Sequence, residues 1–215
     1  MNTKMRGWKG VRAGLGRRVL SLALAALMLW GLLPELTPKA AAAEWMESYL
    51  ETLVDWGIMR GNGAGDLNPD RVLTRAEFVT LVNRAFGYTE RGTTPFRDVP
   101  ENAWYADDIN IAYQAGYFSG TSETTANPTG RVTREQAAVM LGRNLRMQGT
   151  SGAYSDFADV YQMGNWSRGM IQECAEMGII QGYADGTFRP RNYITRGQMA
   201  CFLVRALGTL VSKPG

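Results

Sequence analysis

Histidine is absent from this sequence, and cysteine occurs only twice among its 215 residues. Without histidine, neither a Ser-His-Asp nor a Cys-His catalytic arrangement can form, and zinc sites built on imidazole are excluded. Cys174 and Cys201 are too few for a structural zinc site or a disulfide-dense scaffold. No pair of carboxylates suited to glycoside hydrolysis is recognisable either. We therefore expect a protein that is not an enzyme and that needs no cofactor or metal.

Outside the N-terminal segment, basic residues are fewer than acidic ones. Residues 1–43 carry seven Lys and Arg but a single acid, Glu35, which leaves the remainder with 16 basic and 19 acidic residues. The positive formal charge therefore belongs to the N-terminal segment, and the rest of the chain is mildly acidic. Such a charge distribution offers no electrostatic footprint for nucleic acid, so nucleic-acid binding is not expected.

The N-terminal segment has the pattern of a secretory signal. Six basic residues precede an apolar run at 19–33, and small residues follow at Ala41 and Ala43. Because the apolar run is shorter than the roughly 20 residues that span a bilayer, we predict a signal peptide at 1–43, cleaved after Ala43. An uncleaved N-terminal anchor is the alternative. No second hydrophobic segment follows, so no transmembrane segment is expected after cleavage.

Three tandem copies of one pattern fill the rest of the sequence, at 44–90, 91–150 and 151–215. Each copy has a tryptophan, glycines twelve and sixteen residues later, a proline at 24 and a Thr-Arg pair at 29 and 30. The recurring residues are Trp45, Trp104 and Trp166; Gly57, Gly116 and Gly178; Gly61, Gly120 and Gly182; Pro69, Pro128 and Pro190; Thr74-Arg75, Thr133-Arg134 and Thr195-Arg196.

Each copy predicts a helix, a loop and a second helix. The first helix is expected to start near the tryptophan and to end at the first glycine, which takes a left-handed conformation at little cost. The second helix is expected to begin at the threonine, because Thr74-x-x-Glu77, Thr133-x-x-Gln136 and Thr195-x-x-Gln198 are capping boxes. Each helix pair has one apolar side, so the three copies must pack together. The predicted fold is all-α.

The sequence resembles the S-layer homology (SLH) repeat. The motifs that carry the resemblance are Phe-x-Asp-Val at 96–99 and 157–160, the segment GIIQGYADGTFRP at 178–190, and Ile-Thr-Arg at 194–196. The resemblance extends from residue 44 to about 210. It implies three repeats in a pseudo-threefold, three-prong bundle, in a secreted protein of the cell wall or cell surface. It also implies a non-catalytic anchor on secondary cell-wall polysaccharide or another peptidoglycan-linked glycan, often one bearing acidic, pyruvylated sugars.

The same resemblance implies binding sites in grooves between the repeats. Carried over by position, the principal ligand contacts are Arg75, Arg134 and Arg196. The tryptophans and loop glycines map to Trp45, Trp104, Trp166, Gly61, Gly120 and Gly182. Two departures from the family pattern bear on these sites: Asp-Gly is present only in the third copy, and the first copy lacks the Phe-x-Asp-Val segment.

The arginines also suggest a site on physical grounds. A cation at the first position of a helix opposes the helix dipole, so its presence in all three copies indicates a role with the free amides as an anion site. The alternative is structural, with the arginines in salt bridges to acids such as Asp98 or Asp159. The tryptophans also have two interpretations: they stack on sugars, or they pack the first helix.

Two further alternatives remain open from the sequence. Cys174 and Cys201 fall at apolar helix positions, where they would be either a disulfide or two buried thiols. The function also has an alternative: an exported scaffold subunit that holds another cell-surface protein.

Overall fold

The computed structural model describes residues 38–61, 65–149 and 156–211. Most of the predicted signal peptide therefore lies outside the described residues, as does the side chain of Trp45. The chain divides into two units, Met1–Ala41 and Ala42–Gly215, and the three repeats belong to the second. Within the described ranges, no helix has both the length and the apolar character needed to cross a membrane.

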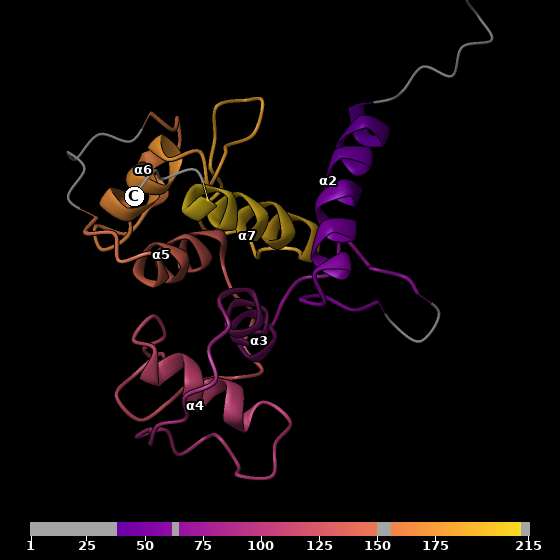
Figure 1. The fold of residues 1–215 in the computed structure, drawn as a ribbon. Coiled ribbons are helices and arrows are strands. Elements are labelled where there is room, and N and C mark those ends of the chain that lie inside the picture. The colour runs from indigo at the N-terminus through magenta and orange to yellow at the C-terminus, as the bar shows by residue number, and fades with distance from the viewer. Residues whose placement is uncertain (1–37, 62–64, 150–155, 212–215) are drawn as a thin grey trace, which may run out of the picture. The chain divides into compact units, whose positions relative to one another are not determined.

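The described residues form helices joined by loops and isolated bridges, which confirms the predicted all-α class. Figure 1 shows the arrangement. The elements are α2 (Pro38–Asp55), α3 (Arg75–Phe86), α4 (Ala106–Gln114), α5 (Arg134–Asn144), a 3₁₀ turn η1 (Val160–Gln162), α6 (Arg168–Glu176) and α7 (Arg196–Val211).

The predicted helix boundaries hold for most elements. The Thr74 hydroxyl accepts a hydrogen bond from the Glu77 amide, and the Glu77 carboxylate accepts one from the Thr74 amide at 2.9 Å. The same reciprocal bonds form at the starts of α5 and α7. The glycines predicted to end the first helices all have positive φ: 71° at Gly57, 83° at Gly116 and 71° at Gly178.

The start of α2 differs from the prediction. Helices α4 and α6 begin just after their tryptophans, as expected, but α2 begins at Pro38 and runs through the predicted cleavage position at Ala43. Four consecutive alanines at 40–43 explain the extension, because alanine has the highest helix propensity, and the sequence at 38–44 contains none of the residue types that favour the start of a helix as N-caps.

Three residues at one repeat position form a closed backbone ring at the centre of the repeats. The amide of Leu73 donates to the carbonyl of Ile194 at 3.1 Å, Val132 donates to Leu73 at 3.1 Å, and Ile194 donates to Val132 at 2.9 Å. Each repeat thus donates one backbone hydrogen bond and accepts another. Because all three side chains are fully buried, this ring is the hub of a pseudo-threefold arrangement.

The helices that pack together come from consecutive repeats. Helix α3 packs against α4, and α5 packs against α6 (Figure 1). At the third position, Arg205 of α7 stacks over the ring of Tyr49 in α2, with 5.3 Å between the guanidinium carbon and the ring centroid. Each second helix therefore uses the first helix of the next repeat as its partner, and the third repeat closes on the first.

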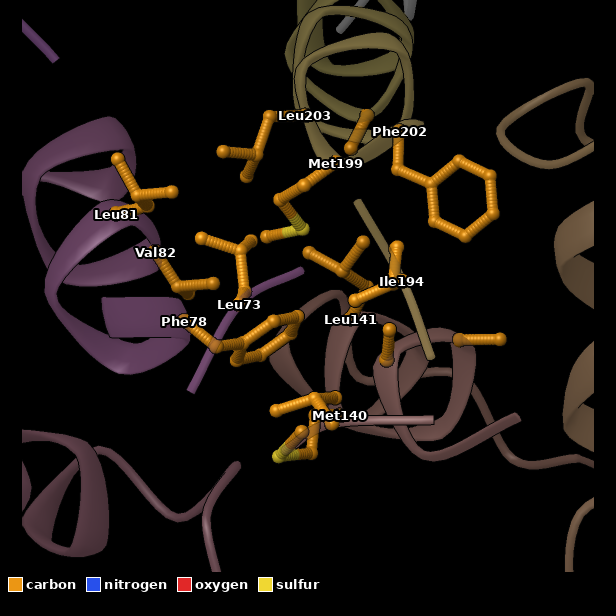
Figure 2. Close-up of a cluster of buried hydrophobic side chains, with 14 of the residues drawn as sticks. Leu73, Phe78, Leu81, Val82, Met140, Leu141, Ile194, Met199, Phe202 and Leu203 are labelled. Carbon is orange, nitrogen blue, oxygen red and sulfur yellow. The ribbon is translucent and has the colours of Figure 1, made fainter. Parts of the chain in front are cut away.

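Apolar side chains from all three second helices meet around the hub. Figure 2 shows Phe78 of α3, Leu141 of α5 and Met199 of α7 in one buried cluster with Leu73 and Ile194. Fully burying a side chain of this size contributes about 1.5–3 kcal/mol, so a shared centre stabilises three repeats that have little core individually.

Both cysteines are free, buried thiols, so the disulfide alternative is wrong and the thiol alternative is confirmed. Cys174 lies in the interface between α6 and α5, with its sulfur 3.7 Å from the carbonyl oxygen of Ala138. Cys201 donates instead to the carbonyl of Gly197 within its own helix.

Candidate functional site

The backbone amides at the starts of the second helices are occupied by the next repeat. The Arg75 amide donates to the Gly130 carbonyl at 2.8 Å, and the Ala76 amide donates to Pro128 at 2.9 Å. The equivalent amides of α5 donate to Asn192 and Pro190, and those of α7 donate to Arg71 and Pro69. The prediction of free amides as anion donors is therefore wrong, because a proline-containing loop of the following repeat caps each helix.

The three arginine side chains reach the same loops. The Nε–H groups of Arg75, Arg134 and Arg196 donate to carbonyl oxygens at one repeat position, those of Ala126, Phe188 and Leu67, at 2.7, 2.8 and 2.7 Å. Arg75 is 5% exposed and Arg134 is 3% exposed, whereas Arg196 is half-buried. Each arginine is therefore a clamp between consecutive repeats.

The acids that the sequence offered as salt-bridge partners, Asp98 and Asp159, bind the loops that the arginines contact and not the arginines themselves. Asp98 accepts from the amides of Ala126 and Asn127 at 2.8 and 2.7 Å, and Asp159 accepts from Phe188 and Arg189 at the same distances. Each carboxylate thus fixes the loop whose carbonyl receives the arginine. Across the described ranges, no ion pair joins these acids to the clamp arginines, so the predicted salt bridges are not observed.

The first repeat lacks the Phe-x-Asp-Val aspartate but has a local substitute. Asp66 lies two residues before Asn68 and accepts a hydrogen bond from the Asn68 amide at 2.8 Å. Asn68 occupies the repeat position of Asn127 and Arg189, and all three residues have positive φ, between 48° and 57°. The loop conformation is thus kept in the first repeat although the lead-in segment is missing.

Burial changes the acidity of the clamp arginines. Desolvation lowers the pKa of Arg75 to about 10, partly offset by the negative charge of Asp98. Burial likewise lowers the pKa of Arg134 and of Arg196. A guanidinium nevertheless stays charged at neutral pH. Each clamp therefore places a positive charge against neutral carbonyl acceptors.

Two of these arginines lie at the wall of a cleft. The Arg75 cleft, of about 370 Å³, is lined by side chains that include Arg75, Gly120, Thr121, Gln136, Arg143 and Trp166. The Arg134 cleft, of about 230 Å³, is lined by Arg134, Gly182, Tyr183, Gln198, Arg205 and Met46, among others. The two linings match position by position, except that Met46, the neighbour of Trp45, takes the place of Trp166.

The other predicted site residues are distributed unevenly around these clefts. Trp166 is 58% exposed and lines the Arg75 cleft. Trp104 is 66% exposed and contacts Tyr105 edge to face, so neither tryptophan packs in the core. Gly120 and Gly182 line the clefts and allow close packing, because a Cβ atom would lie 2.6 Å from the lead-in rings of Phe96 and Phe157.

The Arg196 position differs from the two clefts in its charge. Glu77 occupies the repeat position of Gln136 and Gln198, and its carboxylate pairs with Arg71 at 2.7 Å. Burial raises the pKa of Glu77, but hydrogen bonds from Arg71 and Thr74 lower it by more, so the net pKa lies below the ordinary value. The carboxylate is therefore ionised at neutral pH. Gly61 is the loop glycine of the first repeat. A Cβ atom added there would lie 2.9 Å from the carbonyl group of Gly65.

Comparison with known families identifies the repeats. The family model of the S-layer homology domain matches residues 39–79, 95–138 and 156–200, which together make up more than half of the chain. The chain belongs to the S-layer homology family. Its three SLH repeats correspond to the three copies predicted from the sequence.

This chain matches a small part of each of several longer proteins. The chain is 29% identical over 191 residues to the Surface-layer 125 kDa protein of Lysinibacillus sphaericus, covering 83% of this chain and 16% of that protein. It is 31% identical over 151 residues to the Surface layer protein of Brevibacillus choshinensis, with coverages of 67% and 12%. An Endoglucanase of Bacillus sp. (strain KSM-635) is 38% identical over 129 residues, with coverages of 60% and 13%. The chain thus spans less than a fifth of each of these relatives. The two surface-layer proteins among them support the expected cell-surface location.

Sequence reasoning missed several residues of the SLH clefts. Gln136 and Gln198 serve as helix caps and also line the clefts, and Arg143 and Arg205 add a second cation to each. The signal was available, since Arg84, Arg143 and Arg205 recur at one repeat position. Within residues 38–61, 65–149 and 156–211, no three His, Cys, Asp or Glu side chains gather closely enough to hold a metal ion.

Proposed function

We propose that this protein is a non-catalytic anchor that attaches to the cell wall by binding an acidic polysaccharide in the clefts between its repeats. The observation that carries the proposal is the matched lining of the Arg75 and Arg134 clefts. Each is lined by a buried arginine at the start of one second helix, and by a glutamine and a second arginine of the next second helix. Arg196 holds the same repeat position and belongs to the proposal as the third contact.

The chemistry of the clefts suits a sugar that bears a carboxylate. Arginine has five N–H donors, and the intramolecular hydrogen bonds account for one at Arg75 and two at Arg134. The remaining donors match the planar geometry of a carboxylate. Trp166 offers an exposed ring for the apolar face of a sugar. A polymer with ketal-linked pyruvate would supply both the carboxylate and the sugar face.

Binding to purified sacculi tests the proposal. Changing the clamp arginines would perturb folding, so the informative variant is Trp166→Ala, with Trp56→Ala as the matched control. Trp56 is also more than half exposed and does not line either cleft. We expect Trp166→Ala to weaken binding about tenfold, or about 1.4 kcal/mol, and Trp56→Ala to leave it unchanged. Equal binding by the two variants would argue against the Arg75 cleft.

Two treatments of the sacculi extend this test. Removing ketal-linked pyruvate from the polysaccharide should reduce binding strongly, and undiminished binding would reject an acidic pyruvylated ligand. Removing the polysaccharide altogether should abolish binding. Retention on stripped sacculi would reject the polysaccharide as the ligand. Crosslinking on intact cells tests the alternative, in which the protein holds another cell-surface protein, and recovery of wall glycan without a protein partner would count against it.

A further inference from the structure

A second cavity adjoins the Arg75 cleft. It has a volume of about 410 Å³ and lies where the ends of α3, α4 and α5 meet. Its lining includes Tyr88, Glu90, Gln114, Arg143, Asn144 and Arg146. Arg143 lines both spaces, and its Nη1 donates to the Ser119 hydroxyl at 3.0 Å. The two cavities therefore meet at one arginine side chain. We call the second cavity the Arg146 pocket.

Arg146 has a backbone conformation that glycine adopts at lower cost. Its φ is 58°, just after α5, whereas the corresponding turn after α3 uses Gly87 with φ of 69°. The Arg146 amide donates to Arg143 and the Met147 amide to Gly142, both at 2.9 Å, which is a glycine-type helix ending. A left-handed conformation is unfavourable for a residue with a Cβ, because the Cβ comes too close to the following carbonyl oxygen.

The side chain of Arg146 offers no compensating contact inside the protein. Arg189 also has positive φ, but its guanidinium pairs with Asp185 at 2.9 Å and lies 3.8 Å from the centre of the Tyr183 ring. Over the described ranges, no hydrogen bond, ion pair or ring contact engages the Arg146 guanidinium. An unfavourable backbone conformation thus holds an exposed cation at the wall of a cavity.

Asn144 supplies an independent observation in the same wall. Its side chain is buried, and both its Oδ1 and its Nδ2 lack a hydrogen-bond partner. Leaving a buried polar group unpaired is costly, because its hydration is lost without replacement, and such groups are rare in folded proteins. A carboxamide both donates and accepts, as a sugar hydroxyl does, so the two groups are complementary.

We propose that the Arg146 pocket is a second sugar subsite, which binds the unit of the polymer next to the one held in the Arg75 cleft. This inference rests on the proposed function of that cleft. Among its lining residues, Arg143 and Arg146 can donate hydrogen bonds to the sugar and Glu90 can accept them. Asn144 and Gln114 can both donate and accept. A mixture of donors and acceptors suits a hydroxyl-rich sugar, and the size falls within the ordinary range of ligand pockets.

Fragments of graded length test the subsite. The probe is the wall polysaccharide released from the organism's own sacculi and separated into single repeating units and longer fragments. Titration calorimetry should show that the unaltered protein binds long fragments about tenfold more tightly than single units. Arg146→Gly should remove this gain without changing the affinity for single units. It should also shift the denaturant midpoint upwards, since glycine relieves the backbone strain.

Two further variants separate a binding role from a structural one. Asn144→Leu, which removes the unpaired amide at similar volume, should also lose the length-dependent gain while the fold persists. Arg97→Ala removes an exposed arginine outside both cavities and should change neither affinity. Unaltered binding of long fragments by Arg146→Gly would overturn the subsite. If the unaltered protein binds single and long fragments equally, the subsite alone fails. If it binds neither, the proposed function fails with it.

Discussion

The clamp role of Arg134 leads to a quantitative prediction for Arg134→Met. Methionine fills the space of the aliphatic part of the side chain but removes all of its N–H donors. The carbonyls of Phe188 and Gln181 would then lose hydrogen bonds of 2.8 and 3.2 Å. The contact with the Phe188 ring, 4.7 Å from the guanidinium carbon to the centroid, would also lose its cation–π component.

The expected magnitude follows from opposing contributions. Two hydrogen bonds from a charged donor contribute about 3–6 kcal/mol, and the ring contact contributes about 0.5–2 kcal/mol. Methionine removes the cost of burying a charge without an ionic partner, which is several kcal/mol. We expect the free energy of unfolding to fall by about 2–4 kcal/mol. Arg196→Met should cost less, because Arg196 is only half-buried.

Equilibrium unfolding in guanidinium chloride, followed by circular dichroism, measures both variants against the unaltered protein. The slope of the transition should stay constant, since the change removes contacts without altering the surface exposed on unfolding. A loss below about 0.5 kcal/mol for Arg134→Met, typical of a neutral surface substitution, would refute the clamp. A larger loss for Arg196→Met than for Arg134→Met would refute its dependence on burial.

Two other predictions concern the loop support and the thiols. Asp159→Asn should lower the free energy of unfolding by about 2–3 kcal/mol. The reason is that the amide side chain can accept only one of the two backbone hydrogen bonds and turns an N–H donor toward the other backbone amide. A loss near zero in a denaturant titration would contradict this role. Burial raises the pKa of both Cys174 and Cys201 to about 12. Neither thiol should therefore react with a disulfide reagent at neutral pH in the native protein, and both should react once the protein is denatured. Fast labelling of the native protein would show that the thiols are accessible.

The sequence was sufficient to predict the elements that depend on local chemistry. The second helices begin at Thr74, Thr133 and Thr195, because a threonine hydroxyl and a Glu or Gln three residues later satisfy each other's backbone amides. These bonds are made within four residues and do not depend on the rest of the fold. Gly57 and Gly116 end theirs because the left-handed conformation is a local preference of glycine. The threefold repetition of these signals was enough to predict an all-α array of three repeats.

The contacts between repeats could not be predicted in the same way. The repeats show that an arginine recurs at the position of Arg75 in each copy. They do not show that the partner of Arg75 is a backbone carbonyl 51 residues further along the chain. Backbone carbonyls are present at every residue, so a sequence contains no sign of which one is the acceptor. The expectation of free helix-start amides failed for the same reason, since the loop around Pro128 that occupies them belongs to another repeat.

A carbonyl partner has an electrostatic consequence that a carboxylate partner would not have. A salt bridge from Arg134 to Asp159 would have cancelled the positive charge beside the cleft, and an acidic sugar would then gain little from binding there. In the structure, Asp159 instead accepts from two backbone amides and holds the Phe188 carbonyl toward the guanidinium. The charge of Arg134 is thus held in place by neutral acceptors. The contact that joins the second and third repeats therefore also keeps the cleft positive, so this joint and the proposed anion site depend on the same side chain.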